Sequence, residues 1–412
     1  MITNSTKLEQ VLKVTHELLQ IQDIDVLLEC MLTEVRAIVG ADAGSIYLVE
    51  GNELEFSYTQ NSTLSNKLPY GKKLVYSTFK IKINNQSIAG YVANTGITTN
   101  IDDAYRIDSY QPYSFDKHFD ETTGYRTQSI LTVPIKSSDG KVSGVIQLIN
   151  AFNPDKTIRS FTSSEESIVQ LFADNASIAI SNAQMTRSLI MRMNKMIELH
   201  DPKETVEHAN RIAAYSVEIY EAWARKRGVP EREIQNSRSV LRMAAMFYNI
   251  GKISVPNSVL IKRKEDLTAT EMITVELHTV YGARLFSNPY SDFEKMVQSI
   301  TLNHHERWDG SGFPGHIDLD TGLPLPGYEK PGGGAFGKRG PEIPIYGRIV
   351  AVADFYDYLI YRVTPDKATK DKAVETILAN SGTQFDPDVV AAFISCVDVI
   401  NSISDRYEDT TQ

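Results

Sequence analysis

Apolar residues recur at helical spacing close to the start of the chain. Between residues 8 and 39, leucine, valine, isoleucine and methionine return every three or four positions, which predicts two amphipathic helices, the first over residues 1–20. Four later segments are short, rich in β-branched and aromatic residues and bounded by Gly, Asp or Asn: residues 43–49, 53–58, 129–135 and 142–150. They predict an antiparallel sheet, so residues 21–170 are expected to form a domain of this sheet and flanking helices.

The second half of the chain is predicted to be almost wholly helical. One apolar pattern begins at Ser163 and predicts a single long helix, with residues 171–200 linking two domains. An all-α bundle is expected over residues 201–400, followed by a flexible polar tail over residues 401–412. Residues 315–344 contain repeated Pro and Gly and are expected to form a long surface loop. The fold class is therefore a multidomain α+β protein.

Composition indicates the cellular setting. The 412 residues, of which 42% are hydrophobic and 23% charged, fit two or three globular domains. A formal net charge of −10 argues against a general nucleic-acid binder, which would need clustered Lys and Arg. Cys30 and Cys396 lie in apolar helical patterns and fit buried, reduced thiols. Apolar runs stay short of the roughly 20 residues that a membrane span needs, so a cytoplasmic protein outside the membrane is expected.

The strongest chemical signal is the segment His-His-Glu-Arg-Trp-Asp-Gly-Ser-Gly-Phe-Pro over residues 304–314, where two adjacent imidazoles precede a Gly-Pro turn. Glu204 and His208 lie four residues apart and therefore share one face of a predicted helix. The other candidates for the same site are Tyr248, Asn249, Lys252, His278, Asp354 and Asp357. Histidines and carboxylates spread over several helices are typical of metal-dependent phosphohydrolases, in which the metal makes hydroxide and neutralises phosphate charge.

The N-terminal half resembles a GAF domain over about residues 21–187. The resemblance rests on three stretches: Asn100-Ile-Asp-Asp-Ala-Tyr, Thr-Gly-Tyr-Arg-Thr at 123–127, and Gly144-Val-Ile-Gln-Leu-Ile-Asn. It is greatest for the GAF domains of cyclic-nucleotide phosphodiesterases and cyclases. The signature of that subgroup appears here as Asn150, Phe161, Glu165 and Glu166, with Ala151 where the subgroup has lysine. In the family this lysine pairs with the acid, so the resemblance implies that a structural ion pair is missing.

Three interpretations of the GAF-like domain stay open. It could relay signals and dimerise without a ligand, it could bind a purine nucleotide, or it could bind another small molecule. A long polar connection over residues 86–124 lies between the two halves of the predicted sheet. Long connections of this kind are commonly functional, and pockets often form over a sheet.

The second half resembles the HD-GYP family of metal-dependent phosphodiesterases, which hydrolyse the bacterial messenger cyclic di-GMP, over about residues 193–399. The resemblance is carried by residues 304–314, Ile343-Pro344, Arg348-Ile349, Ala353-Asp354 and Asp357. It implies that Fe, Mn or Zn is held by Glu204, His208, His278, His304, His305 and Asp354. It also implies a catalytic or substrate-contacting role for Lys252, Asp357 and Arg307, with Lys252 on phosphate and Arg307 facing guanine or phosphate.

The sequence departs from the family at its defining dipeptide. Tyr248-Asn249 stands where the family has His-Asp. Tyrosine, with a pKa of about 10, is not an equivalent imidazole ligand, and a neutral amide lacks the charge with which a carboxylate bridges two cations. We therefore expect incomplete metal occupancy and weak or absent hydrolysis. A milder departure is Gly312-Phe313-Pro314 in place of Gly-Tyr-Pro, which keeps the turn and the aromatic ring but loses a hydroxyl.

Three states of the metal site stay open: one ion on His278, His304 and His305 with water completing its shell, a full cluster, or no specific metal. The functional hypotheses differ accordingly. The chain is either a GAF-controlled cyclic di-GMP phosphodiesterase, a catalytically silent relative that binds a nucleotide or partner, or a hydrolase of another phosphoester. Apolar stripes predict a homodimer through the N-terminal and linker helices. In HD-GYP proteins the region around residues 315–344 is implicated in binding diguanylate cyclase domains.

Overall fold

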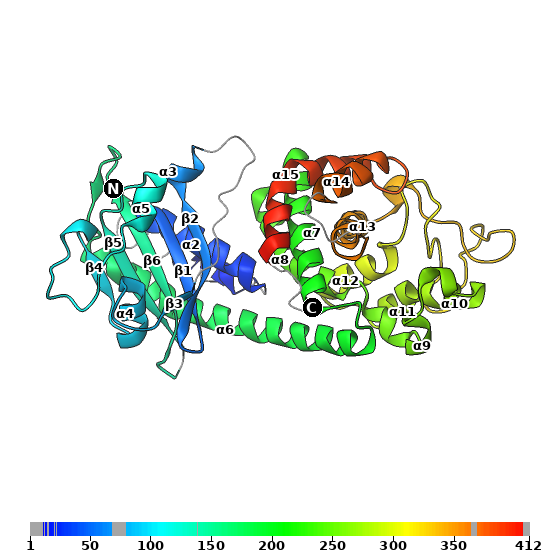
Figure 1. The fold of residues 1–412 in the computed structure, drawn as a ribbon, viewed down its shortest axis with the longest axis horizontal. Helices are drawn as coiled ribbons and strands as arrows, with labels where there is room; N and C mark the ends of the chain where they lie inside the picture. Colours follow the sequence, from blue (N-terminus) through cyan, green and yellow to red (C-terminus); the bar gives the residue numbers. More distant parts are fainter. Residues whose placement is uncertain are drawn as a thin grey trace. The chain divides into compact units, whose positions relative to one another are not determined.

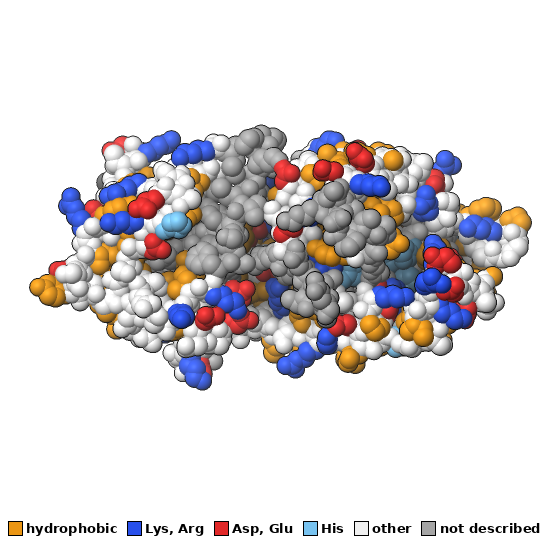
Figure 2. Space-filling view, viewed as in Figure 1, with side chains coloured by type: hydrophobic (Ala, Val, Ile, Leu, Met, Phe, Trp, Pro, Cys, Tyr) orange, Lys and Arg blue, Asp and Glu red, His pale blue; other side chains and the backbone are white. Residues whose placement is uncertain are grey.

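A computed structural model describes residues 11–406, apart from 12, 15, 20, 22, 68–79, 138 and 364–368. The chain divides into two compact units, Met1–Thr186 and Arg187–Gln412 (Figure 1). Most of the predicted N-terminal helix over residues 1–20, and residues 407–412 of the predicted tail, lie outside the described residues. Acidic and basic side chains lie side by side over the described surface that Figure 2 shows.

The first unit contains an antiparallel sheet in the order β3-β2-β1-β6-β5-β4, with β7 paired to β6. Its strands are β1 (Ala41–Glu50), β2 (Glu53–Asn61), β3 (Lys80–Lys82), β4 (Thr99–Ile101), β5 (Ile130–Lys136), β6 (Val142–Phe152) and β7 (Ile158–Arg159). The inward residues of β1, β5 and β6, such as Ile46, Val133 and Ile146, are fully buried. The antiparallel sheet predicted from the alternating segments is therefore confirmed.

Two helices share the core on this sheet. Helix α2 (Ile24–Val39) begins at Asp23, whose carboxylate accepts the backbone N–H groups of Asp25 and Val26, and it ends at Gly40. Its buried residues pack in one cluster with the first part of α6 (Ser163–His200) and with β1, β5 and β6. The remaining helices are α3 (Ser62–Ser65), α4 (Ile88–Thr95), the 3-10 helix η1 (Ala104–Arg106) and α5 (His118–Thr123). The expected long connection over residues 86–124 therefore carries α4, β4, η1 and α5.

The expected loss of the signature ion pair is wrong, because Arg159 supplies the missing cation. Arg159 lies directly opposite Ala151 in the pairing of β6 with β7. Its Nη1 and Nη2 donate to the two carboxylate oxygens of Glu165, each at 2.8 Å. Burial acts to raise the pKa of Glu165, but Arg159 and the backbone N–H of Thr162 outweigh it and hold that pKa below its usual value. The positive charge that pairs with Glu165 is therefore carried by β7, opposite the position on β6 where the subgroup has lysine.

The other signature residues keep structural roles in the first unit. Asn150, in left-handed conformation with φ 57°, accepts the backbone N–H of Gln128 at 2.8 Å and donates to the Arg126 carbonyl at 2.8 Å. Phe161 is buried in the same core as α2. Glu166 accepts a hydrogen bond from the Asn100 side chain at 3.2 Å.

The second unit is a helical bundle. Its helices are α7 (Val206–Lys226), α8 (Glu231–Ala244), α9 (Asn257–Leu260), α10 (Ala269–Glu276), α11 (His278–Arg284), α12 (Asp292–Asn303), α13 (Ile345–Tyr358), α14 (Thr369–Ala379) and α15 (Pro387–Arg406), with 3-10 helices η2 (Ala245–Phe247), η3 (Ile250–Ser254), η4 (Lys264–Asp266) and η5 (Gly340–Glu342) and the π-helix η6 (Leu359–Val363). Its core includes Ile190 and Ile197 from the second part of α6. The predicted all-α architecture is confirmed.

Among the described residues, Pro387–Asp405 in α15 is the one helical segment whose length and apolarity would suit a membrane span. Its Val389, Val390 and Phe393 are at most 2% exposed and belong to the core of the second unit. The apolar character of α15 is therefore explained by its packing as a core helix.

Residues 315–344 form an extended segment with no long helix or strand among its described residues. Two isolated bridges, Ile317–Pro324 and Glu329–Ala335, fold it back on itself. The buried Glu306 carboxylate accepts the backbone N–H groups of Gly315 at 2.6 Å and Lys338 at 3.0 Å. One side chain beside the histidine pair therefore anchors the first residue of this loop and a second position near its end.

Candidate metal centre and ligand pocket

Three histidines predicted as metal ligands come together in the second unit. His278 is the first residue of α11, and His304 and His305 directly follow α12. One ring nitrogen from each lies within 4.8 Å of those of the other two. Three nitrogen atoms this close can bind one ion together.

Backbone hydrogen bonds fix which nitrogen of two rings is available. The Nδ1 atom of His278 lies 2.6 Å from the Val275 carbonyl oxygen, and that of His304 lies 3.1 Å from the carbonyl oxygens of Ile300 and Thr301. Because a carbonyl oxygen only accepts, both Nδ1 atoms carry the hydrogen and both Nε2 atoms carry a lone pair. These Nε2 atoms face each other at 3.4 Å. Two lone pairs at this distance are suited to a shared cation.

The electrostatic environment keeps the three rings neutral. Burial lowers the pKa of His304, and it holds the pKa of His278 and His305 well below the ordinary value, with the neighbouring imidazoles and Lys252 adding to the effect. Neutral imidazole is the form that binds metal ions. The donor set and its protonation state therefore fit a divalent metal ion.

The Gly-Phe-Pro turn supports the histidine pair. The Phe313 ring stacks on the His305 ring with centroids 4.9 Å apart. A Cβ atom on Gly312 would lie 2.3 Å from the backbone nitrogen of Arg307, so only glycine fits there. Arg307 itself donates to the Ser311 hydroxyl at 2.9 Å and faces Asp309 at 3.5 Å, so in this structure its partners lie within its own turn.

The remaining predicted ligands surround the Tyr248 hydroxyl. This atom lies 2.6 Å from His208 Nε2, 2.9 Å from Asp354 Oδ1 and 3.3 Å from Glu204 Oε2. Tyr248 is only 2% exposed, and its ring centroid lies 5.2 Å from that of His304. The hydroxyl therefore occupies the nitrogen and oxygen atoms with which a second metal ion would have to bind.

Asp357 contacts the other ring nitrogen of His208, and Arg211 binds Asp357 in turn. Arg211 was not among the residues predicted for this site. His208 Nδ1 lies 2.6 Å from Asp357 Oδ2, and Arg211 Nε donates to Asp357 Oδ1 at 2.7 Å. Burial acts to raise the pKa of Asp357, but His208 and Arg211 hold it below the usual value. Arg211 follows His208 by three residues on α7, and this spacing was the available signal. Asp357 orients His208 here.

Lys252 pairs with carboxylates of the same site. Its Nζ donates to Glu204 Oε1 at 2.6 Å and lies 3.5 Å from Asp201 Oδ2. The Asn249 side chain donates from Nδ2 to Glu204 Oε2 at 2.9 Å. The predicted phosphate-binding ammonium is thus neutralised within the protein, beside the two substituted positions.

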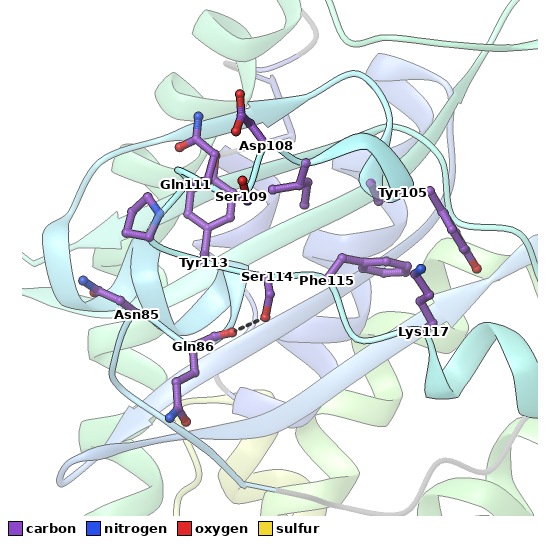
Figure 3. Close-up of a pocket in the computed structure, with 13 residues that line it drawn as sticks. Asn85, Gln86, Tyr105, Asp108, Ser109, Gln111, Tyr113, Ser114, Phe115 and Lys117 are labelled. Atoms are coloured by element: carbon purple, nitrogen blue, oxygen red, sulfur yellow. Dashed lines mark hydrogen bonds between the residues drawn. The ribbon is translucent and has the colours of Figure 1, made fainter.

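The first unit has a separate pocket of about 490 Å³ on the connection before β5 (Figure 3). Tyr105, Tyr113 and Phe115 are among the side chains that line it, together with Asp108, Lys117 and several amides and hydroxyls. The Ser114 hydroxyl donates to the Gln86 carbonyl at 3.0 Å and ties the connection to the residues before α4. Aromatic faces combined with a few polar groups are typical of small-molecule sites.

Two family models match the chain. The GAF domain model matches residues 23–180, and the HD domain model matches residues 162–322. The chain joins a GAF domain to an HD domain. The two matches overlap over residues 162–180, within α6. The HD match includes the three histidines and ends before Asp354.

Curated relatives resemble part of the chain. The 3′3′-cGAMP-specific phosphodiesterase 2 of Vibrio cholerae is 26% identical over 223 residues, which cover 54% of this chain and 37% of that protein. A cyclic di-GMP phosphodiesterase of Thermotoga maritima is 31% identical over 222 residues, covering 53% of this chain and 52% of that protein. The matched regions span about half or less of these relatives' lengths. A solved GAF domain from an Acinetobacter phosphoenolpyruvate-protein phosphotransferase has 17% identity and a TM-score of 0.33, covering 43% of this chain and 94% of that one.

Proposed function

We propose that this chain is a cytoplasmic bacterial signalling protein of the GAF and HD-GYP type whose HD domain holds one divalent metal ion on His278, His304 and His305. Hydrolysis of cyclic di-GMP is weak or absent. The observation that carries this proposal is the Tyr248 hydroxyl, which lies 2.6 Å from His208 Nε2 and so engages the atom that a second ion would need. Phosphodiester cleavage by paired metals uses both ions, one on each side of the displacement.

A bound metal ion would supply Lewis-acid chemistry. The surrounding side chains determine whether a phosphate group can also be bound and positioned at that ion. Lys252 is shared by Glu204 and Asp201, at 2.6 and 3.5 Å, so its charge is already compensated. Asp357 and Arg211 hold His208 against Tyr248. The side chains around the three histidines thus favour a site that binds an ion without rapid turnover.

The test is metal content followed by turnover. The purified full-length chain is expected to retain about one Fe, Mn or Zn per chain by elemental analysis, and His304→Ala is expected to lose it. Replacing Tyr248 with His and Asn249 with Asp together should raise cyclic di-GMP hydrolysis at least about tenfold, the scale at which ligand surroundings commonly change activity. An unmodified chain that carries two or more ions and hydrolyses cyclic di-GMP rapidly would contradict the proposal.

Active hydrolysis of cyclic di-GMP or another phosphoester through this reduced metal site is the second candidate. Three protein ligands with a water molecule in the fourth position form a common catalytic pattern, and the three clustered histidines favour it. A turnover screen over cyclic dinucleotides and nucleotide monoesters distinguishes the candidates, because only the second expects rapid product formation, which is lost in His304→Ala.

For the GAF domain we propose a regulatory ligand, a purine nucleotide in the first instance, in the pocket lined by Tyr105, Tyr113 and Phe115. Aromatic faces suit the stacking of a base, and Asp108 and Lys117 offer one group of each charge. Mass spectrometry of the compound released from freshly purified protein tests this assignment.

We also propose a homodimer through the N-terminal and linker helices, and a diguanylate cyclase domain as a partner of the loop over residues 315–344.

A further inference from the structure

Asn249 has a buried acceptor with no hydrogen-bond partner among the described residues. Its side chain is 7% exposed, and Oδ1 is enclosed without a donor. Its Nδ2 donates to Glu204 Oε2 at 2.9 Å. Because an ionised carboxylate can only accept, this contact fixes the amide with its NH₂ group toward Glu204 and its oxygen away from it. Buried carbonyl oxygens are nearly always satisfied, so this one is available to a further partner.

The position of Asn249 in the chain places it beside the three histidines. The ring of the preceding residue, Tyr248, lies 5.2 Å from the His304 ring between centroids. Two residues further on, a Cβ atom on Gly251 would lie 1.8 Å from the His278 carbonyl oxygen, so the backbone of η3 touches the start of α11. Asn249 therefore sits between a residue that contacts one histidine and a residue that contacts another.

The hydrogen-bond partner of Asn249 is also close to the same rings. The charge of Glu204 acts on the pKa of both His278 and His305. Glu204 is held by Lys252 at 2.6 Å, and the Tyr248 hydroxyl adds a contact at 3.3 Å. A fixed carboxylate next to the histidines thus orients the Asn249 amide.

We propose that Asn249 Oδ1 is a fourth protein ligand of the ion held by His278, His304 and His305. The inference rests on the proposed function, which places one ion on these histidines. Amide oxygens are ordinary ligands of divalent cations, and three imidazole nitrogens with one oxygen suit Zn, Fe or Mn. The amide brings no negative charge, so it serves a single ion and does not hold two ions together as a carboxylate does. Glu204 is the positioning residue for this ligand.

The experiment is a Zn²⁺ titration of the metal-free full-length chain against a competing chelator. Asn249→Leu keeps the volume but removes the oxygen, and it is expected to weaken Zn²⁺ binding at least about tenfold. Asn249→Asp keeps the shape and adds a charge, and it is expected to tighten binding at least about tenfold. Asn236→Leu, at an exposed position on α8, is the matched control and should bind like the unmodified chain.

The possible outcomes separately test the Asn249 ligand, the three-histidine site and the role of Glu204. If the unmodified chain binds one Zn²⁺ and neither Asn249 variant changes the affinity, the ligand assignment is overturned while the three-histidine site stands. If the unmodified chain binds no Zn²⁺, the proposed metal centre fails and this ligand fails with it. Glu204→Leu should weaken binding more in the unmodified chain than in Asn249→Leu, because part of the effect of Glu204 passes through the amide and the rest through its charge near the histidines. Equal losses in both backgrounds would overturn the positioning role.

Discussion

Single side chains determine the polar network at the centre of this HD domain. Tyr248 contacts three of the residues predicted as metal ligands, His208, Asp354 and Glu204. A tyrosine hydroxyl in that place satisfies buried polar atoms without a cation, and this stabilises the network. The GAF domain has a comparable replacement, since Arg159 pairs with Glu165 where the family uses a lysine one strand away.

Removing the relocated cation is expected to destabilise the GAF domain. Arg159→Met leaves the Glu165 carboxylate, which is 6% exposed, without its two charged donors. We expect a loss of about 1.5–3 kcal/mol in the free energy of unfolding, the usual value for hydrogen bonds to charged groups. Arg159→Lys should lose less because it keeps the charge. Urea unfolding curves of the full-length chain measure the change.

The control is Arg106→Met. Arg106 forms its ion pair with Asp103 while its own side chain is 86% exposed, so this substitution should cost no more than about 1 kcal/mol. Equal losses for the two substitutions would contradict a structural role for the Arg159–Glu165 pair.

Elements were easier to predict from the sequence than the partners that they bring together. The alternating strands of the GAF domain and the long helix from Ser163 were readable because their periods are set by burial on one face. Tyr248-Asn249 was also visible as a departure from the family. Arg211 was not predicted to pair with Asp357, because α7 and α13 are far apart in sequence and meet only through packing. Arg159 lies only six residues before Glu165, but its pairing depends on the turn between β7 and α6, which residue spacing alone does not predict.

At the scale of a loop, Glu306 is expected to control the order of residues 315–338. Its carboxylate accepts the N–H groups of both Gly315 and Lys338, whereas a glutamine side chain in its place could accept with only one of its two polar atoms. Glu306→Gln should therefore increase hydrogen exchange at Gly315 or Lys338 at least about tenfold, as a lost charged hydrogen bond implies. Glu329→Gln, an exposed acid in the same loop, should leave both amides protected.

For the whole molecule, helix α6 carries the main prediction about assembly. Exposed apolar residues recur along it at successive spacings of seven, four, seven and three residues: Ile178 57%, Met185 63%, Leu189 54%, Met196 61% and Leu199 77% exposed. A seam of this spacing on one helix is complementary to the same seam on a second copy. Continuous exposed apolar surface is also unusual on a monomer. The stripe supports the proposed homodimer.

Charges placed on this stripe are expected to separate the dimer. Leu189→Glu combined with Met196→Glu should convert a dimer to a monomer at micromolar concentration, because like charges would face each other across the seam. Light scattering coupled to size-exclusion chromatography measures the mass. Gln184→Glu, exposed on α6 but away from the stripe, should leave the mass unchanged. A monomeric unmodified chain would contradict the proposed assembly.

The burial of His278 and His305 has a consequence for the uptake of an ion. Metal sites built from exposed histidines lose their ion on mild acidification, since protons compete for the same nitrogens. Here the pKa of His278 and His305 lies well below the ordinary value because of burial, so few protons are present to be displaced at neutral pH. Uptake of the proposed ion should release almost no acid, and that ion should be retained at moderately acidic pH.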